Sequence, residues 1–307
     1  MAYQKAKSLI YQVKERLDSM DAMGQSKYKA KIEAICSGTA SSGHIDYGNK
    51  IYSFKTKKAY LDHCCHFAKW VRETHGCKTL EDARRYADEY LSVRLSQGCT
   101  APTLKLDRAA LAKLYGEHAG DFRALPIRHR ADIKRGRTMT QNRSEFHEER
   151  HLDLIDFARA TGLRRVELEK LRVRDICDRG DLILIEVHRG KGGKDRTVTA
   201  DSDFYDRIRE IVHGANADTR VCNLFDGGDG VGEAHIPRRA PMHSYRRDFA
   251  QKMYTRIARD TSLLSERAIY RCRKDMYGCV FDRAALKAVS VQLGHSRVNV
   301  IAEHYMR

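Results

Sequence analysis

The sequence predicts a mainly α-helical protein of the α+β class, with two domains and one small β-hairpin or sheet in the second of them. Two observations carry this prediction. Between residues 54 and 115, apolar residues recur at the three- and four-residue spacing of amphipathic helices. Further along, two short runs rich in β-branched residues, 181–187 and 196–199, flank a glycine-rich turn and predict paired strands. A length of 307 residues is sufficient for two domains of ordinary size.

The chain is strongly basic, because 57 lysines and arginines against 41 acidic residues give a formal net charge of +16. This charge indicates a polyanionic partner, either nucleic acid or an anionic membrane surface. No apolar run approaches the roughly 18 residues that a membrane span needs. Residues 1–5 also lack the apolar core of a signal peptide. We therefore predict a cytoplasmic protein that binds nucleic acid and has no membrane partner.

The cysteines and histidines do not predict a metal site. Nine cysteines are scattered without a Cys-x-x-Cys pair, which favours free thiols in a reducing compartment. The string His63-Cys64-Cys65-His66 has the residue types of a zinc site. Adjacent residues on a helix point in different directions, however, so they cannot converge on one ion. We predict that the protein uses neither a metal nor a cofactor.

Four segments follow from the helix signals and the charge pattern. We predict an N-terminal helical arm over 1–45, a small helical DNA-binding domain over 46–118, a basic interdomain linker over 119–147 and a second domain over 148–307. In the small domain, helices are expected over 54–75, from Thr79 to Gly98, and from Thr100 onward.

Basic residues of the first 147 positions supply candidate DNA contacts. Those on outward helix positions are Lys55, Lys57 and Lys58, and those in the linker are Arg128, Arg130, Lys134 and Arg135. Cations spaced along a segment with few apolar residues can follow a phosphate backbone. The alternative is that the lysines form an ordinary solvated helix face and that the linker contacts nothing.

The second domain combines helices with the predicted hairpin. We expect helices over 151–160, 203–213, 243–258 and 282–293, besides a helical turn over 166–171. The glycines between the two strands make a flexible tip that carries Lys191 and Lys194.

Four motifs of this domain resemble those of the tyrosine recombinases, the phage-integrase family of DNA breaking-and-joining enzymes. They are Thr161-Gly162-Leu163-Arg164-x-x-Glu167-Leu168, Gly190-Lys191-Gly192, His243-x-x-Arg246, and Leu293-Gly294-His295 followed by Tyr305. Residues 50–115 also resemble the helical core-binding domain of that family. The resemblance therefore covers about 50–307 and is weakest over 255–280, which looks like an insertion.

The resemblance implies a fold and an activity. The fold would be a two-domain C-shaped clamp, in which a helical core-binding (SAM-like) domain and a tyrosine-recombinase catalytic domain surround duplex DNA. The activity would be site-specific recombination of double-stranded DNA through a 3′-phosphotyrosyl intermediate. By the same resemblance the enzyme would act as a homo-tetramer on paired sites in the nucleoid, with accessory DNA-bending proteins as further partners.

The resemblance also implies a role for each motif residue. Arg164 and Arg246 would hold the non-bridging oxygens of the scissile phosphate, since guanidinium groups offer forked donors that offset developing charge. Tyr305 would be the nucleophile and Lys191 the general acid. His243 and His295 would bond the phosphate and assist proton loss from the tyrosine. Lys194, next to Asp195, would instead form a surface ion pair or a phosphate contact.

Several points stay open at this level. A type IB topoisomerase uses similar chemistry as a monomer, and a DNA-binding protein with a relic site would keep the fold without the activity. The ten positions from His295 to Tyr305 are one more than we expect of the family, which leaves the register of the tyrosine helix open. The target site, the spacing of strand cuts, the coupling between subunits and the choice among integration, excision and dimer resolution are not encoded in recognisable motifs.

Overall fold

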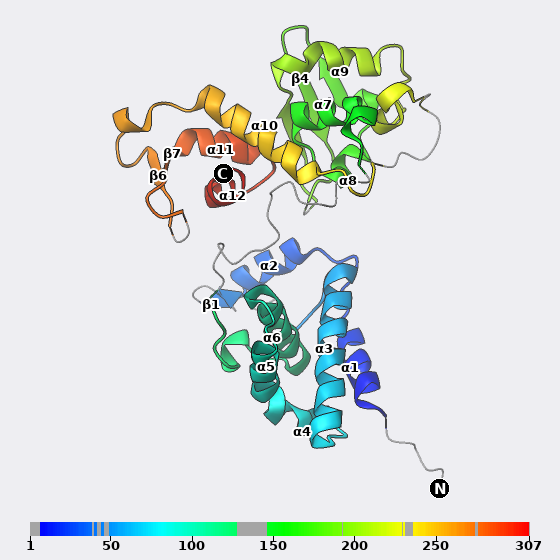
Figure 1. Ribbon diagram of the computed structural model, residues 1–307, viewed down its shortest axis with the longest axis vertical. Coiled ribbons are helices and arrows are strands. Elements are labelled where there is room, and N and C mark those ends of the chain that lie inside the picture. Colours follow the sequence, from blue (N-terminus) through cyan, green and yellow to red (C-terminus); the bar gives the residue numbers. More distant parts are fainter. Residues whose placement is uncertain are drawn as a thin grey trace. The chain divides into compact units, whose positions relative to one another are not determined.

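The computed structural model describes residues 7–38, 40–41, 44–45, 49–127, 146–191, 193–228, 230, 236–273 and 276–306. Its contacts divide the chain into two compact units, Met1–Asp132 and Ile133–Arg307 (Figure 1). The predicted linker contacts Arg128, Arg130, Lys134 and Arg135 lie outside the described residues, as does Gly192 of the lysine motif. Within the described part of the chain, no helix is both long and apolar enough to cross a membrane.

The first unit is a helical bundle. Its elements are α1 (Leu9–Asp18), α2 (Lys27–Cys36), the paired β1 (Ala40–Ser41) and β2 (His44–Ile45), α3 (Phe54–His75), α4 (Leu80–Ala83), α5 (Ala87–Ser96) and α6 (Ala101–Tyr115). Phe67 of α3 is fully buried at the centre, with its ring edge-on to Tyr90 of α5 at 5.3 Å between centroids. The side chains of Val13 and Leu17 on α1 belong to the same core, so α1 packs as part of the bundle.

The string His63-Cys64-Cys65-His66 lies on α3, and its side chains point in different directions. Cys64 is buried in the core, whereas His66 is exposed. His63 Nδ1 lies 2.5 Å from Oδ1 of the buried Asp107 on α6, and Arg94 Nε donates to the other oxygen of that carboxylate at 3.3 Å. His63 is therefore a hydrogen-bonding partner of a buried carboxylate. Among the described residues, no cluster of three or more side chains is suited to hold a metal ion.

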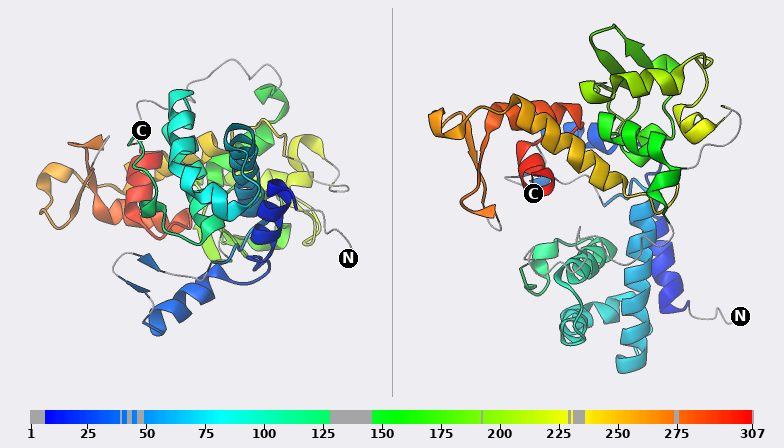
Figure 2. Two further views of the ribbon diagram at one scale, coloured as in Figure 1. Left: turned by 90° about the horizontal axis from the view of Figure 1, so that it is seen from below. Right: turned by 45° about the horizontal axis from the view of Figure 1, so that its top comes forward.

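The second unit combines helices with two small antiparallel sheets. Its elements are α7 (Leu152–Thr161), α8 (Arg165–Leu168), β3 (Ile176–Asp178), β4 (Ile183–Val187), β5 (Arg196–Thr199), α9 (Tyr205–Val212), α10 (Met242–Ile257), β6 (Ile269–Arg271), β7 (Val280–Asp282), α11 (Arg283–Gln292) and α12 (Val298–Tyr305). The strand order of the larger sheet is β3-β4-β5, with Ile185 opposite Val198. The β3–β5 sheet and the β6–β7 hairpin lie at opposite ends of this unit, with α10 between them (Figure 2).

The structure confirms the predicted fold class: the described chain is mainly helical, with small antiparallel sheets. The two strands predicted over 181–187 and 196–199 are β4 and β5, joined as a hairpin. Ile183, Ile185 and Val187 are buried while Glu186 is exposed, which is the alternation of a strand with one face on a core. The sequence did not predict β3, nor the β6–β7 hairpin, of which β6 lies in the stretch 255–280 that looked like an insertion and β7 begins at its last residue.

Candidate active site

The hydroxyl of Tyr305 lies between two of the predicted site residues. Its oxygen is 3.2 Å from Nε of Arg246 on α10 and 3.2 Å from Nε2 of His295 in the turn after α11. On α12, Ile301 and Ala302 are fully buried. Because residues three and four apart share a helix face, their burial turns Tyr305 inward, toward the rest of the same unit. The ten-residue spacing from His295 is thus compatible with a tyrosine that meets Arg246 and His295 of its own chain.

Arg246 is a buried arginine, with only 1% of its surface exposed. It donates to the backbone carbonyls of Gly162 and Leu293 and to the hydroxyl of Tyr305, and all three of these partners are neutral. Burial lowers the pKa of this guanidinium to about 10, so it is still a cation at neutral pH. A buried cation held by neutral groups is costly unless an anion joins it. This arrangement favours an anionic ligand beside Tyr305.

Gly162 explains why the Thr-Gly-Leu-Arg motif needs a glycine. It ends α7 in the left-handed conformation, with φ of 58°. A Cβ at this position would lie 2.5 Å from Cδ1 of Phe249 on α10. Only glycine therefore permits both the backbone turn and the close approach of the two helices, through which the Gly162 carbonyl reaches Arg246.

Arg164 is held by a carboxylate that the sequence analysis did not count as a site residue. Glu167 accepts from Arg164 Nη1 at 2.7 Å and from the Arg164 backbone N–H at 2.9 Å. The same carboxylate accepts from Nη1 and Nη2 of Arg196 at 2.9 and 2.8 Å. Burial opposes ionisation of Glu167, but the bonds from Arg196 and Arg164 outweigh it and lower its pKa to about 2.

Of Glu167 and Arg196, only Glu167 could have been identified from the sequence. Glu167 stands three positions after Arg164, which is the spacing of a helix capping box. Arg196 gives no such signal, because its partner lies 29 positions earlier in the chain.

The remaining predicted residues lie at the edge of this cluster. Lys191 is exposed at the tip between β4 and β5, and its charge acts on His295. The N–H of Gly190 donates to the carbonyl of Lys194 at 2.8 Å and closes the tip, while the Lys194 side chain is exposed. His243 is exposed in the first turn of α10, three residues before Arg246.

His295 is a neutral imidazole at pH 7. Burial lowers its pKa, and the nearby positive charges of Arg246, Arg164, Lys191 and Arg196 lower it further, to about 4. In the tautomer that carries its proton on Nδ1, the neutral His295 accepts the tyrosine O–H at Nε2, while Arg246 Nε–H donates to the same tyrosine oxygen. A neutral imidazole in this position can accept a proton from the Tyr305 hydroxyl.

The lowered pKa of His295 predicts how stability depends on pH. An unfolded histidine binds its proton near pH 6.5, whereas His295 in the folded chain does so only near pH 4. Between these values the unfolded state binds more protons, so the free energy of unfolding should fall as pH falls through this window. His295→Gln should show a smaller fall in urea titrations at pH 7 and pH 5. An NMR titration midpoint of His295 near 6.5 would contradict the assignment.

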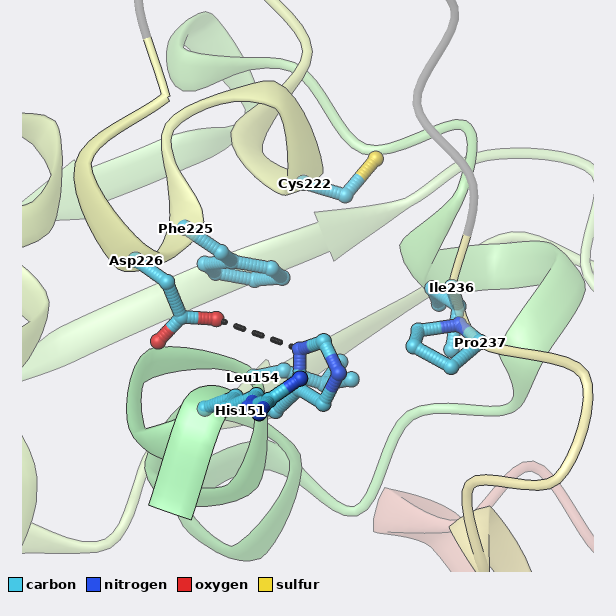
Figure 3. A pocket seen from close by; sticks show the side chains of 8 residues that line it. His151, Leu154, Cys222, Phe225, Asp226, Ile236 and Pro237 are labelled. Carbon is cyan, nitrogen blue, oxygen red and sulfur yellow. Dashed lines mark ion pairs between the residues drawn. The ribbon is translucent and has the colours of Figure 1, made fainter. Parts of the chain in front are cut away.

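A separate pocket lies at the other end of α7, away from Gly162. Its lining includes His151, Leu154 and Phe225, and His151 Nδ1 lies 3.6 Å from Asp226 Oδ2 (Figure 3). The described residues that line it include none of the six predicted catalytic residues. The motif residues that the structure brings together around Tyr305 are therefore separate from this pocket.

Part of the sequence matches a known protein family, and the fold is similar to that of solved structures. Residues 136–227 match the model of the phage integrase family. The structure is similar to that of the XerH site-specific recombinase bound to difH substrate in a pre-cleavage complex, with a TM-score of 0.53 and 17% identity over 100% of this chain and 94% of that chain. For a post-cleavage complex of XerH with palindromic difH substrate, the TM-score is 0.51 and the identity 16%, over 99% and 95% of the two chains. At this identity the similarity shows a shared fold. No curated protein matches the chain in sequence.

Proposed function

We propose that this chain, which belongs to the phage integrase family of tyrosine recombinases, is a site-specific DNA recombinase that works through a 3′-phosphotyrosyl intermediate. The observation that carries the proposal is the hydroxyl of Tyr305, held between the cation of Arg246 and the neutral imidazole of His295. A hydroxyl with a proton acceptor on one side and a buried cation on the other is prepared to attack an anionic electrophile.

The charges around Tyr305 support a phosphodiester as the substrate. Arg164, Arg196, Arg246 and Lys191 are four cations around His295, and Glu167 is the carboxylate among them. A guanidinium has five N–H donors. Arg246 uses three in its described bonds and Arg164 two, so both retain donors for the non-bridging oxygens of a phosphate.

In the proposed cleavage step, the Tyr305 oxygen attacks phosphorus and its proton passes to Nε2 of His295. The bond from phosphorus to the 5′ oxygen breaks, and Lys191 gives that oxygen a proton. Arg164 and Arg246 offset the charge on the non-bridging oxygens as the transition state forms. His243, one turn before Arg246, would bond the same phosphate. Attack of a 5′ hydroxyl on the phosphotyrosine reverses these transfers, so rejoining needs no external energy source.

A plasmid assay distinguishes this function from the alternatives. A supercoiled plasmid with two copies of the preferred site, obtained by binding selection from random DNA, should yield recombinant circles. Relaxation of a plasmid that lacks the site would indicate a topoisomerase. Binding to the site without any change in plasmid topology would indicate a DNA-binding protein. Recombination on paired sites would also support the proposed assembly of four subunits on DNA.

The hairpin tip gives a prediction that separates its two lysines. A general acid matters because the leaving 5′ alkoxide is a strong base, whereas a 5′ thiolate is stable without a proton. Lys191→Ala should therefore cleave ordinary DNA about 10²–10⁴-fold more slowly, yet cleave a 5′-bridging phosphorothiolate at close to the wild-type rate. Lys194→Ala is the matched control and should show no selective rescue. Rescue of Lys194→Ala alone would move the acid to that residue.

We propose that residues 46–118 bind the DNA backbone, and the lysines of α3 give a test. Lys55 and Lys58 are exposed, whereas Lys57 pairs with Asp18 at 2.6 Å and Asp21 at 2.5 Å. Each phosphate contact contributes about 0.9 to the salt slope of binding. Lys55→Ala and Lys58→Ala should each lower that slope by about this amount, and Lys57→Ala should not, since two carboxylates already balance its charge. The opposite ranking would mean that Lys57 leaves its ion pairs to bind DNA.

A further inference from the structure

We propose that Arg196 is a positioning residue that fixes the Lys191 hairpin against the arginines that hold the phosphate. The proposal rests on the proposed function, because it assigns Arg196 a part in proton delivery to the leaving oxygen. One buried side chain would thereby set the distance between Lys191, which acts on the leaving oxygen, and Arg164, which holds a non-bridging oxygen of the same phosphate.

Arg196 is the first residue of β5, and all three of its guanidinium nitrogens are bonded. Nη1 and Nη2 donate to the two oxygens of Glu167, and Nε donates to the carbonyl of Gln292 at 2.9 Å. Only 8% of the Arg196 side chain and 5% of that of Glu167 are exposed. The planar fork of a guanidinium fixes both the distance and the angle of such a pair. The hairpin strand is thereby fixed to α8 and to the end of α11.

Glu167 passes this restraint to the phosphate clamp. Its two oxygens also accept from the side chain and the backbone N–H of Arg164. The carboxylate thus joins the arginine of the phosphate clamp to the arginine of the hairpin. When Arg196 is replaced, Arg164 keeps its own bonds to Glu167 and to the carbonyl of Leu293, so the loss of Arg196 frees the hairpin and leaves the clamp arginine in place.

Two glycines lie directly against Arg196 and connect it to Lys191 and His295. A Cβ on Gly190, the residue before Lys191, would lie 3.0 Å from both Nη1 of Arg196 and the carbonyl oxygen of Lys194, and 3.2 Å from Oε1 of Glu167. A Cβ on Gly294, the residue before His295, would lie 3.0 Å from Cδ of Arg196. The guanidinium and its stem therefore form the surface on which the backbones next to both residues rest.

A purely structural ion pair and a positioning residue predict different kinetics. If Arg196 only stabilised the fold, its loss would slow cleavage of every substrate equally. If it positions Lys191, the loss should be large where the leaving oxygen needs a proton and small where it does not. The comparison between ordinary DNA and the 5′-bridging phosphorothiolate makes this distinction within one protein preparation.

The experiment uses the full chain and a suicide duplex that carries the selected site, with either oxygen or sulfur at the bridging 5′ position. Arg196→Lys keeps the charge but loses the fork, and it should cleave the oxygen substrate at least about ten-fold more slowly while staying within about three-fold of wild type on sulfur. Gly190→Ala crowds both Arg196 and the Lys194 carbonyl and so displaces the tip with every arginine in place, and it should show the same selective rescue.

Arg259→Lys is the matched control. Arg259 makes a fork of the same kind, with Nε and Nη2 at 2.8 and 2.9 Å from the two oxygens of the buried Asp282. It stands 13 positions after Arg246, beyond the end of α10. Its replacement should slow neither substrate selectively, and near-ultraviolet circular dichroism of all variants should match wild type.

Equal slowing of Arg196→Lys on both substrates, or no slowing on either, overturns the proposal. Should Arg196→Lys fail to fold, Gly190→Ala replaces it in the test. Equal slowing of Gly190→Ala on the oxygen and sulfur substrates would then overturn the proposal. Failure of the proposed function would look different, since wild-type protein would then form no covalent complex on either substrate.

Discussion

Tyr305→Phe should bind the DNA site as tightly as wild type and form no covalent complex with a cleaved strand. The change removes one oxygen atom, while the buried Ile301 and Ala302 continue to hold α12 in place. Arg246 and His295 lose only their bonds to that oxygen. Without the nucleophile no other step can begin, so cleavage on a suicide substrate should fall below detection.

Tyr254→Phe is the control for the loss of a hydrogen-bonded hydroxyl in the same unit. The Tyr254 oxygen accepts from the backbone N–H of Asp282 at 2.9 Å, at the far end of α10 from Arg246. This variant should form the covalent complex at the wild-type rate. A covalent complex formed by Tyr305→Phe would show that another residue is the nucleophile.

Arg246→Lys should have the second-largest effect. Removal of one preorganised donor to a developing oxyanion typically costs about 10²–10³ in rate, and a lysine cannot reproduce the fork. The buried carbonyl of Gly162 would also lose its partner, at about 1–3 kcal/mol for an acceptor left unsatisfied, whereas the Leu293 carbonyl keeps its bond from Arg164 Nη2. Both the cleavage rate per bound complex and the free energy of unfolding should therefore fall.

Arg247→Lys tests whether these effects belong to the site. Arg247 follows Arg246 on α10, and its Nη2 donates to Ser244 Oγ at 3.2 Å within the same helix. We expect neither a slower cleavage rate nor a lower stability for this variant. If Arg246→Lys weakened DNA binding but cleaved bound DNA at the wild-type rate, Arg246 would be a backbone contact and not part of the clamp.

The sequence predicted what depends on local pattern. The alternation of Ile183, Ile185 and Val187 identified β4, and the apolar spacing on α3 identified its buried face. Such predictions succeed because they depend only on residues that are close together in the sequence.

What the sequence could not predict depends on partners that are remote in the chain. The sequence around Arg196 does not indicate that its partner is Glu167. The sequence around Lys57 likewise does not indicate that it pairs with Asp18 and Asp21. β3 and the β6–β7 hairpin were missed because their strands have three residues each, too few for alternation to stand out.

The most direct test of the account is the chemical identity of the covalent complex. Wild-type protein is incubated with a suicide substrate in the presence of a metal chelator, digested with protease, and the DNA-linked peptide is identified by mass spectrometry. A 3′ phosphate should be joined to the oxygen of Tyr305, and the other DNA end should carry a free 5′ hydroxyl. Attachment through a 5′ phosphate, attachment to another residue, or a reaction that stops when the chelator is added would contradict it.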